Sequence, residues 1–152
     1  VYLRFGRLAG PVINDRPDYK FEIGKGVLLR EGTDLTIVAT GLCVAGALEA
    51  ADKLAAEGVS AEVINIHTIK PLDKELILNS ARKTGKVVTA EEHSIIGGLG
   101  GAVCEALSEE APTKVLRIGV KDTFGESGPA AALLAKYQLD GAGIYAQIKE
   151  WL

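Results

Sequence analysis

Apolar residues along this chain follow two spacings, which alternate from about residue 24 to the end. Short runs rich in apolar residues, typical of strands in a largely buried sheet, occupy residues 27–29, 35–39, 61–66, 86–90 and 115–119. Apolar positions at helical spacing fill the segments between the runs from residue 35 onward and the stretch after the last run. This alternation predicts right-handed crossovers and a mostly parallel sheet covered by helices on both faces.

Residues with capping preferences mark the ends of the helical segments. Asp73 and Asp140 are interpreted as N-caps, because a short carboxylate accepts the free N–H groups of the first turn. Gly58 and Gly85 are interpreted as the glycines that end the first two helices, and Pro112 closes the third. The predicted helix boundaries therefore rest on backbone chemistry as well as on apolar spacing.

The first strand is predicted to pair with the second. Residues 24–32 form a short apolar strand between glycines, and the four residues 30–33 separate it from the run at 35–39. A connection of that length is typical of a β-hairpin. The predicted fold class is therefore α/β: a three-layer α/β/α sandwich with a five-stranded mixed, mostly parallel sheet whose first strand is antiparallel.

Turn-forming residues indicate a domain boundary near the N-terminus. The stretch from residue 8 to residue 20 has no sustained period and contains Pro11, Asn14, Asp15, Pro17 and Asp18. We assign residues 1–7 to the last strand of a preceding domain, residues 8–22 to a linker, and residues 23–152 to one compact domain. The chain starts inside the β-prone run 1–3 and contains no Met, so we expect it to be part of a longer protein.

The composition narrows the classes of partner. Lys and Arg number 17, Asp and Glu number 20, the two signs are interspersed and the formal net charge is −3, so no nucleic-acid partner is expected. No apolar run approaches the roughly 20 residues that span a bilayer, so no membrane association is expected. Cys43 and Cys104 are far apart and indicate reduced thiols, which favours a cytoplasmic protein.

Polar residues gather where the predicted strands end, at the edge where parallel α/β sheets bind ligands. These ends carry Thr40-Gly41, His67-Thr68, Glu91-Glu92-His93 and Lys121-Asp122. Cys43 lies near a helix N-terminus, where a thiolate would be favoured. No third ligand or Cys-x-x-Cys completes a metal site with the two histidines. Loop histidines more often cap backbone groups or meet a neighbouring domain, so a catalytic or metal role for them is the less favoured interpretation.

The glycine-rich stretch 97–101 allows two interpretations. Glycines before a helix can expose N–H groups to a phosphate, but the G-x-G-x-x-G spacing fails because Val103 occupies the sixth position after Gly98-Leu99-Gly100. The favoured interpretation is that these glycines let the following helix approach the sheet or a partner closely. Glu91 and Glu92 are disfavoured as an acid and base pair, because adjacent residues of an extended segment point to opposite faces.

Two further features are weak on their own. Arg4 and Arg7 are able to hold a phosphate, yet two arginines at a strand end are more often solvated. The loop 124–128 has no nucleophile-elbow pattern and is interpreted as a turn. By themselves, these residues do not make an active site.

Six motifs occur in an order that resembles the C-terminal domain of transketolase, within the thiamine-diphosphate transketolase superfamily. They cover nearly the whole chain, at residues 4–7, 23–26, 34–41, 68–73, 91–100 and 124–128. The motif Phe-Gly-Glu-Ser-Gly at 124–128 favours transketolase over its relatives. The resemblance implies a five-stranded mixed sheet with an antiparallel first strand.

The resemblance also implies that the cofactor is bound elsewhere. Family members carry pyrophosphate-binding and pyrimidine-binding domains, in one chain or split between two, and those domains hold thiamine diphosphate, Mg²⁺ and the activating glutamate. By resemblance, Arg7, or else Arg4, is the terminal arginine that contacts the sugar phosphate. No catalytic, cofactor-binding or metal-binding residue is assigned within this domain.

The resulting hypothesis is a transketolase that moves a two-carbon ketol unit between sugar phosphates, as a homodimer or a dimer of split subunits. The present domain would contribute packing, dimer support and a regulatory surface, and would be inactive alone. One alternative is the same domain of 1-deoxyxylulose-5-phosphate synthase or of a 2-oxo-acid dehydrogenase β subunit. The other is a free-standing ligand-binding or interaction module that uses the edge with His67 and His93.

Overall fold

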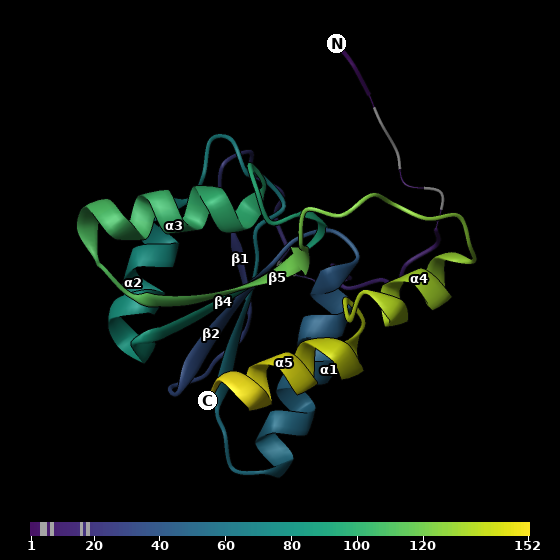
Figure 1. Cartoon of the computed structure of the whole chain (residues 1–152). Coiled ribbons are helices and arrows are strands. Elements are labelled where there is room, and N and C mark those ends of the chain that lie inside the picture. The colour runs from purple at the N-terminus through teal and green to yellow at the C-terminus, as the bar shows by residue number, and fades with distance from the viewer. Residues whose placement is uncertain (4–5, 7, 16, 18) are drawn as a thin grey trace.

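The computed structural model describes residues 1–3, 6, 8–15, 17 and 19–152 and shows a sheet between two layers of helices (Figure 1). In chain order the elements are β1 (Val27–Arg30), β2 (Leu35–Ala39), α1 (Cys43–Ala56), β3 (Ala61–Asn65), α2 (Lys74–Thr84), β4 (Lys86–Ser94), α3 (Leu99–Glu110), β5 (Lys114–Val120), α4 (Ala130–Lys136) and α5 (Gly141–Trp151). The predicted α/β/α sandwich is therefore confirmed.

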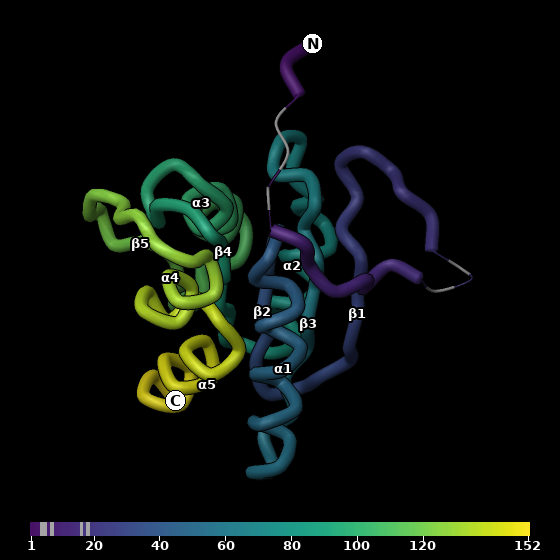
Figure 2. The backbone as a smooth tube through the Cα atoms, turned by 90° about the vertical axis from the view of Figure 1, so that its right-hand side faces the viewer, coloured from purple at the N-terminus to yellow at the C-terminus, as the bar shows by residue number. Residues whose placement is uncertain are grey.

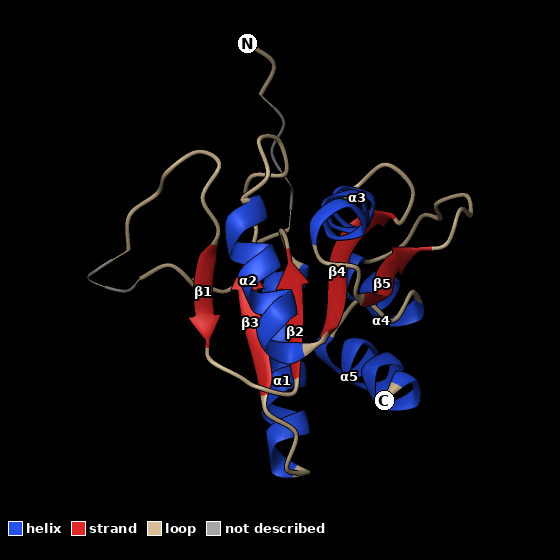
Figure 3. Ribbon diagram, turned by 90° about the vertical axis from the view of Figure 1, so that its left-hand side faces the viewer, coloured by secondary structure: helices blue, strands red, loops and turns tan. Residues whose placement is uncertain are grey.

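The sheet has the strand order β1-β3-β2-β4-β5 (Figure 3). β2, β3, β4 and β5 run parallel, and β1 pairs antiparallel with β3. Ile37 at the centre of β2 lies opposite Val63 on one side and Val88 on the other. The mixed sheet with one antiparallel strand follows the prediction.

The predicted hairpin between the first two strands is wrong. β1 does not pair with β2, because β3 lies between them. All five residues of β2 are buried, which suits a central strand with a partner on each side. The connection from β1 crosses the start of β3, where the backbone N–H groups of Thr33 and Asp34 donate to the carbonyl of Ser60 at 3.1 and 2.9 Å. A Cβ on Gly32 would overlap the backbone of Glu62, so this crossing needs glycine.

The helices divide between the two faces of the sheet. α1 and α5 pack against each other on one face, around a core that includes Leu54, Val63 and Ile144. α2 and α3 cover the other face, around a core that includes Ile64 and Val103. α4 lies beyond the end of the sheet, beside the loop that leaves β5 (Figure 1). The sheet is thus buried on both faces, and the carboxyl ends of its parallel strands lie together at one edge.

The predicted helix ends are confirmed. The Asp73 carboxylate accepts the N–H of Leu76 at 3.3 Å, and the Asp140 carboxylate accepts the N–H of Gly143 at 2.8 Å. Gly85, with φ of 69°, and Gly58, with φ of 84°, adopt the left-handed conformation at the ends of α2 and α1. Pro112 follows α3 directly after Ala111.

The segment before β1 runs along the end of the sheet, over α1 and toward β1 (Figure 2). A Cβ on Gly10 would lie 3.5 Å from the Leu42 side chain, and Ile13 packs against the core beneath α1. Residues 1–3 are exposed and without regular structure. The division into a preceding strand, a linker and residues 23–152 stays a prediction. Within the described residues, no helix is both long and apolar enough to cross a membrane.

Candidate functional site

The carboxyl ends of the central strands border a small, open cavity. β2 and β4 end side by side, and the turn before α3 closes over them. The cavity measures about 310 Å³ and is lined by Thr40, Gly41, Ile69, Glu91, Glu92, His93, Gly97 and Gly98. The structure thus brings the polar end of β2 and the polar end of β4 together, with Ile69 from the loop after β3 beside them.

Glu91 is the buried acid of this edge. Its side chain is 1% exposed, and its two carboxylate oxygens accept the N–H groups of Leu99 and Gly100, each at 2.8 Å. These are free N–H groups of the first turn of α3, which carry a partial positive charge. The chain's own carboxylate therefore fills the position that a phosphate would take, in agreement with the interpretation against a phosphate cradle.

The glycines of the turn permit this close approach. A Cβ on Gly98 would overlap the Glu91 carboxylate, and a Cβ on Gly100 would lie 2.9 Å from Thr89 Oγ1. Gly97 has a φ of 73°, in the left-handed region. The prediction that these glycines bring the helix close to the sheet is confirmed.

The two histidines have separate surroundings. His93 is exposed and its Nδ1 lies 2.9 Å from the carbonyl of Ser94. His67 is half-buried, with Nδ1 2.8 Å from Thr68 Oγ1 and its ring centroid 4.7 Å from that of Phe21. Each ring thus pairs with a neighbour in the chain. Among the residues that the structure describes, no group of three or more His, Cys, Asp or Glu side chains is placed to hold a metal ion.

The expected thiolate at Cys43 is wrong. Cys43 begins α1, but its side chain is fully buried and its thiol donates to the carbonyl of Leu139 at 3.7 Å. Burial, together with the negative charges of Glu92 and Glu91, raises the pKa of Cys43 to about 12. Cys43 therefore stays protonated at neutral pH, because desolvation outweighs the helix terminus.

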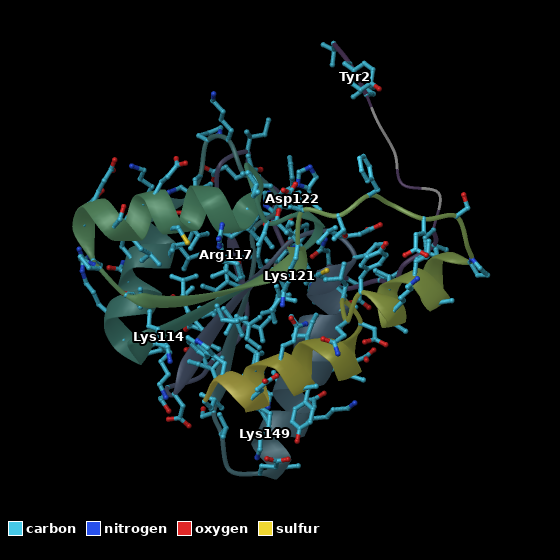
Figure 4. All side chains as sticks on the ribbon, in the orientation of Figure 1. Tyr2, Lys114, Arg117, Lys121, Asp122 and Lys149 are labelled. Atoms are coloured by element: carbon cyan, nitrogen blue, oxygen red, sulfur yellow. The ribbon has the colours of Figure 1, made fainter. Side chains whose placement is uncertain are left out.

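The remaining candidates do not join this cavity. Lys121 and Asp122 are exposed at the end of β5 (Figure 4). Residues 124–128 form an irregular connection with Phe124 at 97% exposure. Arg4 and Arg7 lie outside the described residues, and their contact with a sugar phosphate stays a prediction.

One polar cluster was not anticipated from the sequence. Glu62 on β3 is 1% exposed, pairs with Lys83 of α2 and accepts a hydrogen bond from Thr36 Oγ1 at 3.0 Å. The hydrogen bond to Glu62 raises the pKa of Lys83. The cluster lies near the amino ends of the strands, away from the cavity, and ties α2 to the sheet. The feature of the sequence that could have indicated this cluster is the single acidic residue, Glu62, in the largely apolar run 61–66.

The sequence matches the family described as "Transketolase, C-terminal domain" over residues 24–144. The chain belongs to this family. The match covers every element from β1 to α4 and the first residues of α5, and so includes the cavity and the turn that Glu91 closes. The predicted resemblance is therefore confirmed.

Relatives carry several transketolase-type names. A 6-deoxy-6-sulfo-D-fructose transketolase subunit of Clostridium sp. (strain MSTE9) is 52% identical over 91% of this chain and 43% of its own length. A putative transketolase C-terminal section of Methanocaldococcus jannaschii is 48% identical over 99% of this chain and 47% of its own length. 1-Deoxy-D-xylulose-5-phosphate synthase 1 of Geobacter sulfurreducens is 45% identical over the whole chain and 24% of its own length.

A solved structure shares the fold. It is titled "Split gene transketolase, inactive beta4 tetramer", has a TM-score of 0.88 and 53% identity, and matches 95% of this chain and 47% of its own. The chain thus spans about half the length of the first two relatives and of this structure. Homologues are transketolase-type enzyme subunits, while the family includes more than one reaction.

The edge that Glu91 closes does not fit thiamine diphosphate, the cofactor that this family implies. A diphosphate needs free N–H groups or cations, and the first turn of α3 is already closed by Glu91. The carboxylates of Glu91 and Glu92 also make the cavity electrostatically unfavourable for an anion. The domain alone therefore offers no diphosphate site at this edge.

Proposed function

We propose that this chain is the C-terminal domain of a transketolase that transfers a two-carbon ketol unit between sugar phosphates, and that the domain serves assembly rather than chemistry. The family membership and the transketolase names of relatives support the reaction class. The observation that carries the assembly role is the closure of α3 by Glu91, since it occupies the edge where such a sheet would bind a ligand.

Thiamine diphosphate and Mg²⁺ would be held by the pyrophosphate-binding and pyrimidine-binding domains of the parent enzyme. When bound, thiamine diphosphate supplies the carbanion and the electron sink for ketol transfer. The residues of this domain would hold the neighbouring domains in place. We place this enzyme in the cytoplasm, in line with the free thiols of Cys43 and Cys104.

The partners would be the other domains of the same enzyme, in a homodimer or a dimer of split subunits. The tetramer of β subunits named in the solved structure is described there as inactive, which supports the view that a subunit of this kind needs a second one. Exposed apolar side chains at the carboxyl edge, such as Ile69 at 37% and Ile96 at 60%, are available for such contacts.

A second candidate is the reaction of 1-deoxyxylulose-5-phosphate synthase, because one such enzyme is 45% identical over the whole chain. A 1-deoxy product requires a two-carbon unit without the terminal hydroxyl. The donor that the intact enzyme accepts therefore distinguishes the two reactions. A panel of ketose phosphates, a 6-sulfo ketose and pyruvate, each with an aldose phosphate acceptor, would assign the donor.

Titration calorimetry on the 152-residue chain tests whether the cofactor is bound by the other domains and not by this one. We expect no heat of binding with thiamine diphosphate and Mg²⁺, and no ketol transfer. The intact enzyme, with its remaining domains or subunit, serves as the positive control and should bind the cofactor and turn over a ketose phosphate. Stoichiometric cofactor binding by the 152 residues alone would contradict the proposal.

A further inference from the structure

A long continuous segment of the domain lies on its surface. Every residue from Lys121 to Ala132 is exposed, and we name residues 121–132 the exposed arm. The arm comprises the loop that leaves β5 and the first residues of α4. Its apolar members include Phe124, Pro129 and three consecutive alanines, 130–132. Phe124 is the one large apolar side chain of the arm, and exposed aromatic residues are enriched at protein interfaces.

The arm is held in a defined conformation by side chains beyond it. The Glu126 carboxylate accepts hydrogen bonds from Lys136 Nζ at 2.6 Å and from the Tyr137 hydroxyl at 3.0 Å. The Tyr137 ring is half-buried and packs against the main core. The hydrogen bonds from Lys136 and Tyr137 lower the pKa of Glu126, which favours its charged form. The loop is thereby tied to the core through Tyr137.

Phe124 is therefore presented to solvent by an ordered loop. Its side chain is 97% exposed, although its carbonyl lies 3.4 Å from the Tyr137 hydroxyl. Because the backbone of this loop is tied to the core, burying the ring against a partner would cost mainly the freedom of its two χ angles. Aromatic residues of this kind are enriched among the anchors that dominate binding energies.

α4 adds an apolar face beside this anchor. None of its residues is buried; Leu133 and Leu134 are half-buried, and Leu134 packs against the core. Its remaining positions are four alanines and Lys136. Small apolar side chains permit a close approach by another protein surface. The helix and Phe124 thus form one contiguous candidate for docking.

The N-terminal segment indicates which partner reaches this surface. A cleft of about 770 Å³ is lined jointly by Gly6 and Leu8 of that segment, Gly41 and Leu42, Glu92, and Ala130 of α4. Gly6 and Leu8 thus lie at the same cleft as the first residue of α4. Anything joined to this segment is therefore held at a high effective concentration near the arm.

We propose that the exposed arm is the docking element for the domain that precedes Val1 in the same polypeptide, with Phe124 as the anchor and Glu126 as the residue that positions it. This inference rests on the proposed function, which supplies the preceding domain. A second copy of this domain would have to compete with a partner already tethered beside the cleft.

Photo-cross-linking in the full-length protein tests the docking. p-Benzoylphenylalanine replaces Phe124, and a control protein carries it at Leu152, which is exposed at the opposite end of the sheet. Mixed heavy-isotope and light-isotope preparations separate cross-links within one polypeptide from those between copies. We expect cross-links from position 124 to residues before Val1 of the same polypeptide. Cross-links only to residues 1–152 of a second copy, or none above the Leu152 control, would overturn the proposal.

Hydrogen exchange in the full-length protein gives an independent measurement. Phe124→Ala removes the aromatic anchor and should raise the rate of amide exchange in residues 121–137 roughly tenfold. Glu126→Gln weakens the tie between the loop and Tyr137 and should raise the exchange rate of the same residues by a similar factor. Leu152→Ala is the control and should leave that exchange unchanged. Unchanged exchange in both arm variants would overturn the proposal. Ketol transfer by the unmodified full-length protein is assayed separately, so failure of the proposed function is recognised apart from failure of the docking.

Discussion

The Glu91 carboxylate accepts the backbone N–H of Gly100 at 2.8 Å, and this hydrogen bond joins the end of β4 to the start of α3. The other carboxylate oxygen accepts the N–H of Leu99 at the same distance. The residue that caps α3 is thus a buried glutamate seven residues before the N-cap position, Gly98, whose own side chain is absent. The two hydrogen bonds hold the first turn of α3 against the end of β4.

Replacement of Glu91 should therefore destabilise the domain. In Glu91→Gln, an amide N–H₂ would face one of the two N–H donors, leaving a buried donor unpaired at a cost of about 1–3 kcal/mol. Glu92→Gln is the matched control, because Glu92 is the exposed neighbour and should change the free energy of unfolding by less than about 0.5 kcal/mol. Urea denaturation measures both. Equal midpoints for Glu91→Gln and the unmodified protein would contradict the capping role.

Two adjacent glycines of α3 should respond in opposite directions to alanine. A Cβ on Gly100 would lie 2.9 Å from Thr89 Oγ1 and 3.0 Å from Arg117 Cδ, whereas a Cβ on Gly101 would meet nothing within 4 Å. Overpacking in Gly100→Ala should cost about 1–3 kcal/mol. Gly101→Ala should stabilise by about 0.5–1 kcal/mol, because alanine favours the helix more than glycine does. Thermal unfolding of the two variants, compared with the unmodified protein, measures both signs.

The local elements could be predicted from the sequence because their causes are local. Asp73, Gly85 and Asp140 act on the backbone within a few residues, and the buried run 35–39 is apolar except for Thr36. The pairing of β1 could not be predicted, because it depends on β3, which follows more than thirty residues later. A short connection alone favoured the hairpin.

The candidate site was predictable in position but not in detail. The order of strands and helices correctly placed Thr40 and Glu91 at one edge. The role of Glu91 could not be read from the sequence, because a hydrogen bond to Gly100 depends on how α3 folds back over β4. Cys43 was misjudged for the same reason: the helix terminus is visible in the sequence, but burial beneath Leu139 is not.

The stability of the domain should depend on the ion pair between the buried Glu62 and Lys83. Removing Lys83 leaves a charge that is 1% exposed without its cation. We expect Lys83→Met to destabilise by about 1–3 kcal/mol, less than for a fully buried pair, because the Lys83 side chain is 40% exposed. Lys83→Met combined with Glu62→Gln should recover part of the loss, since the amide keeps the hydrogen bond from Thr36. A double-mutant cycle by urea denaturation measures the coupling, and a coupling of zero would rule out this pair as a stabilising unit.

His93 should matter for assembly more than for chemistry. Its side chain is exposed at the cavity, and its Nδ1 lies within hydrogen-bond distance of the carbonyl of Ser94 in the same turn. In the complete enzyme, we expect His93→Ala to shift the oligomer distribution or lower the melting temperature while turnover per assembled enzyme stays within about threefold, since no chemistry is assigned to this side chain. Analytical ultracentrifugation and a ketol-transfer assay measure the two effects. Loss of turnover with assembly intact would give His93 a chemical role.

The decrease in the free energy of unfolding at alkaline pH should depend in part on Cys43. Burial raises its pKa from 9.0 to about 12, so between these values the unfolded thiol ionises while the folded one keeps its proton. The stabilisation is fully present below pH 9 and is lost as the pH rises toward 12, by up to about 1.4 kcal/mol per pH unit.

Cys43→Ala removes this titration and should flatten the decline in unfolding free energy above pH 9. Cys104→Ala is the control, because Cys104 is only half-buried and burial raises its pKa less far. Alkylation of the folded protein by iodoacetamide at pH 8, followed by mass spectrometry, should modify Cys43 only after urea is added. Rapid labelling of Cys43 without urea would show an accessible thiolate, and the helix N-terminus would then control its ionisation after all.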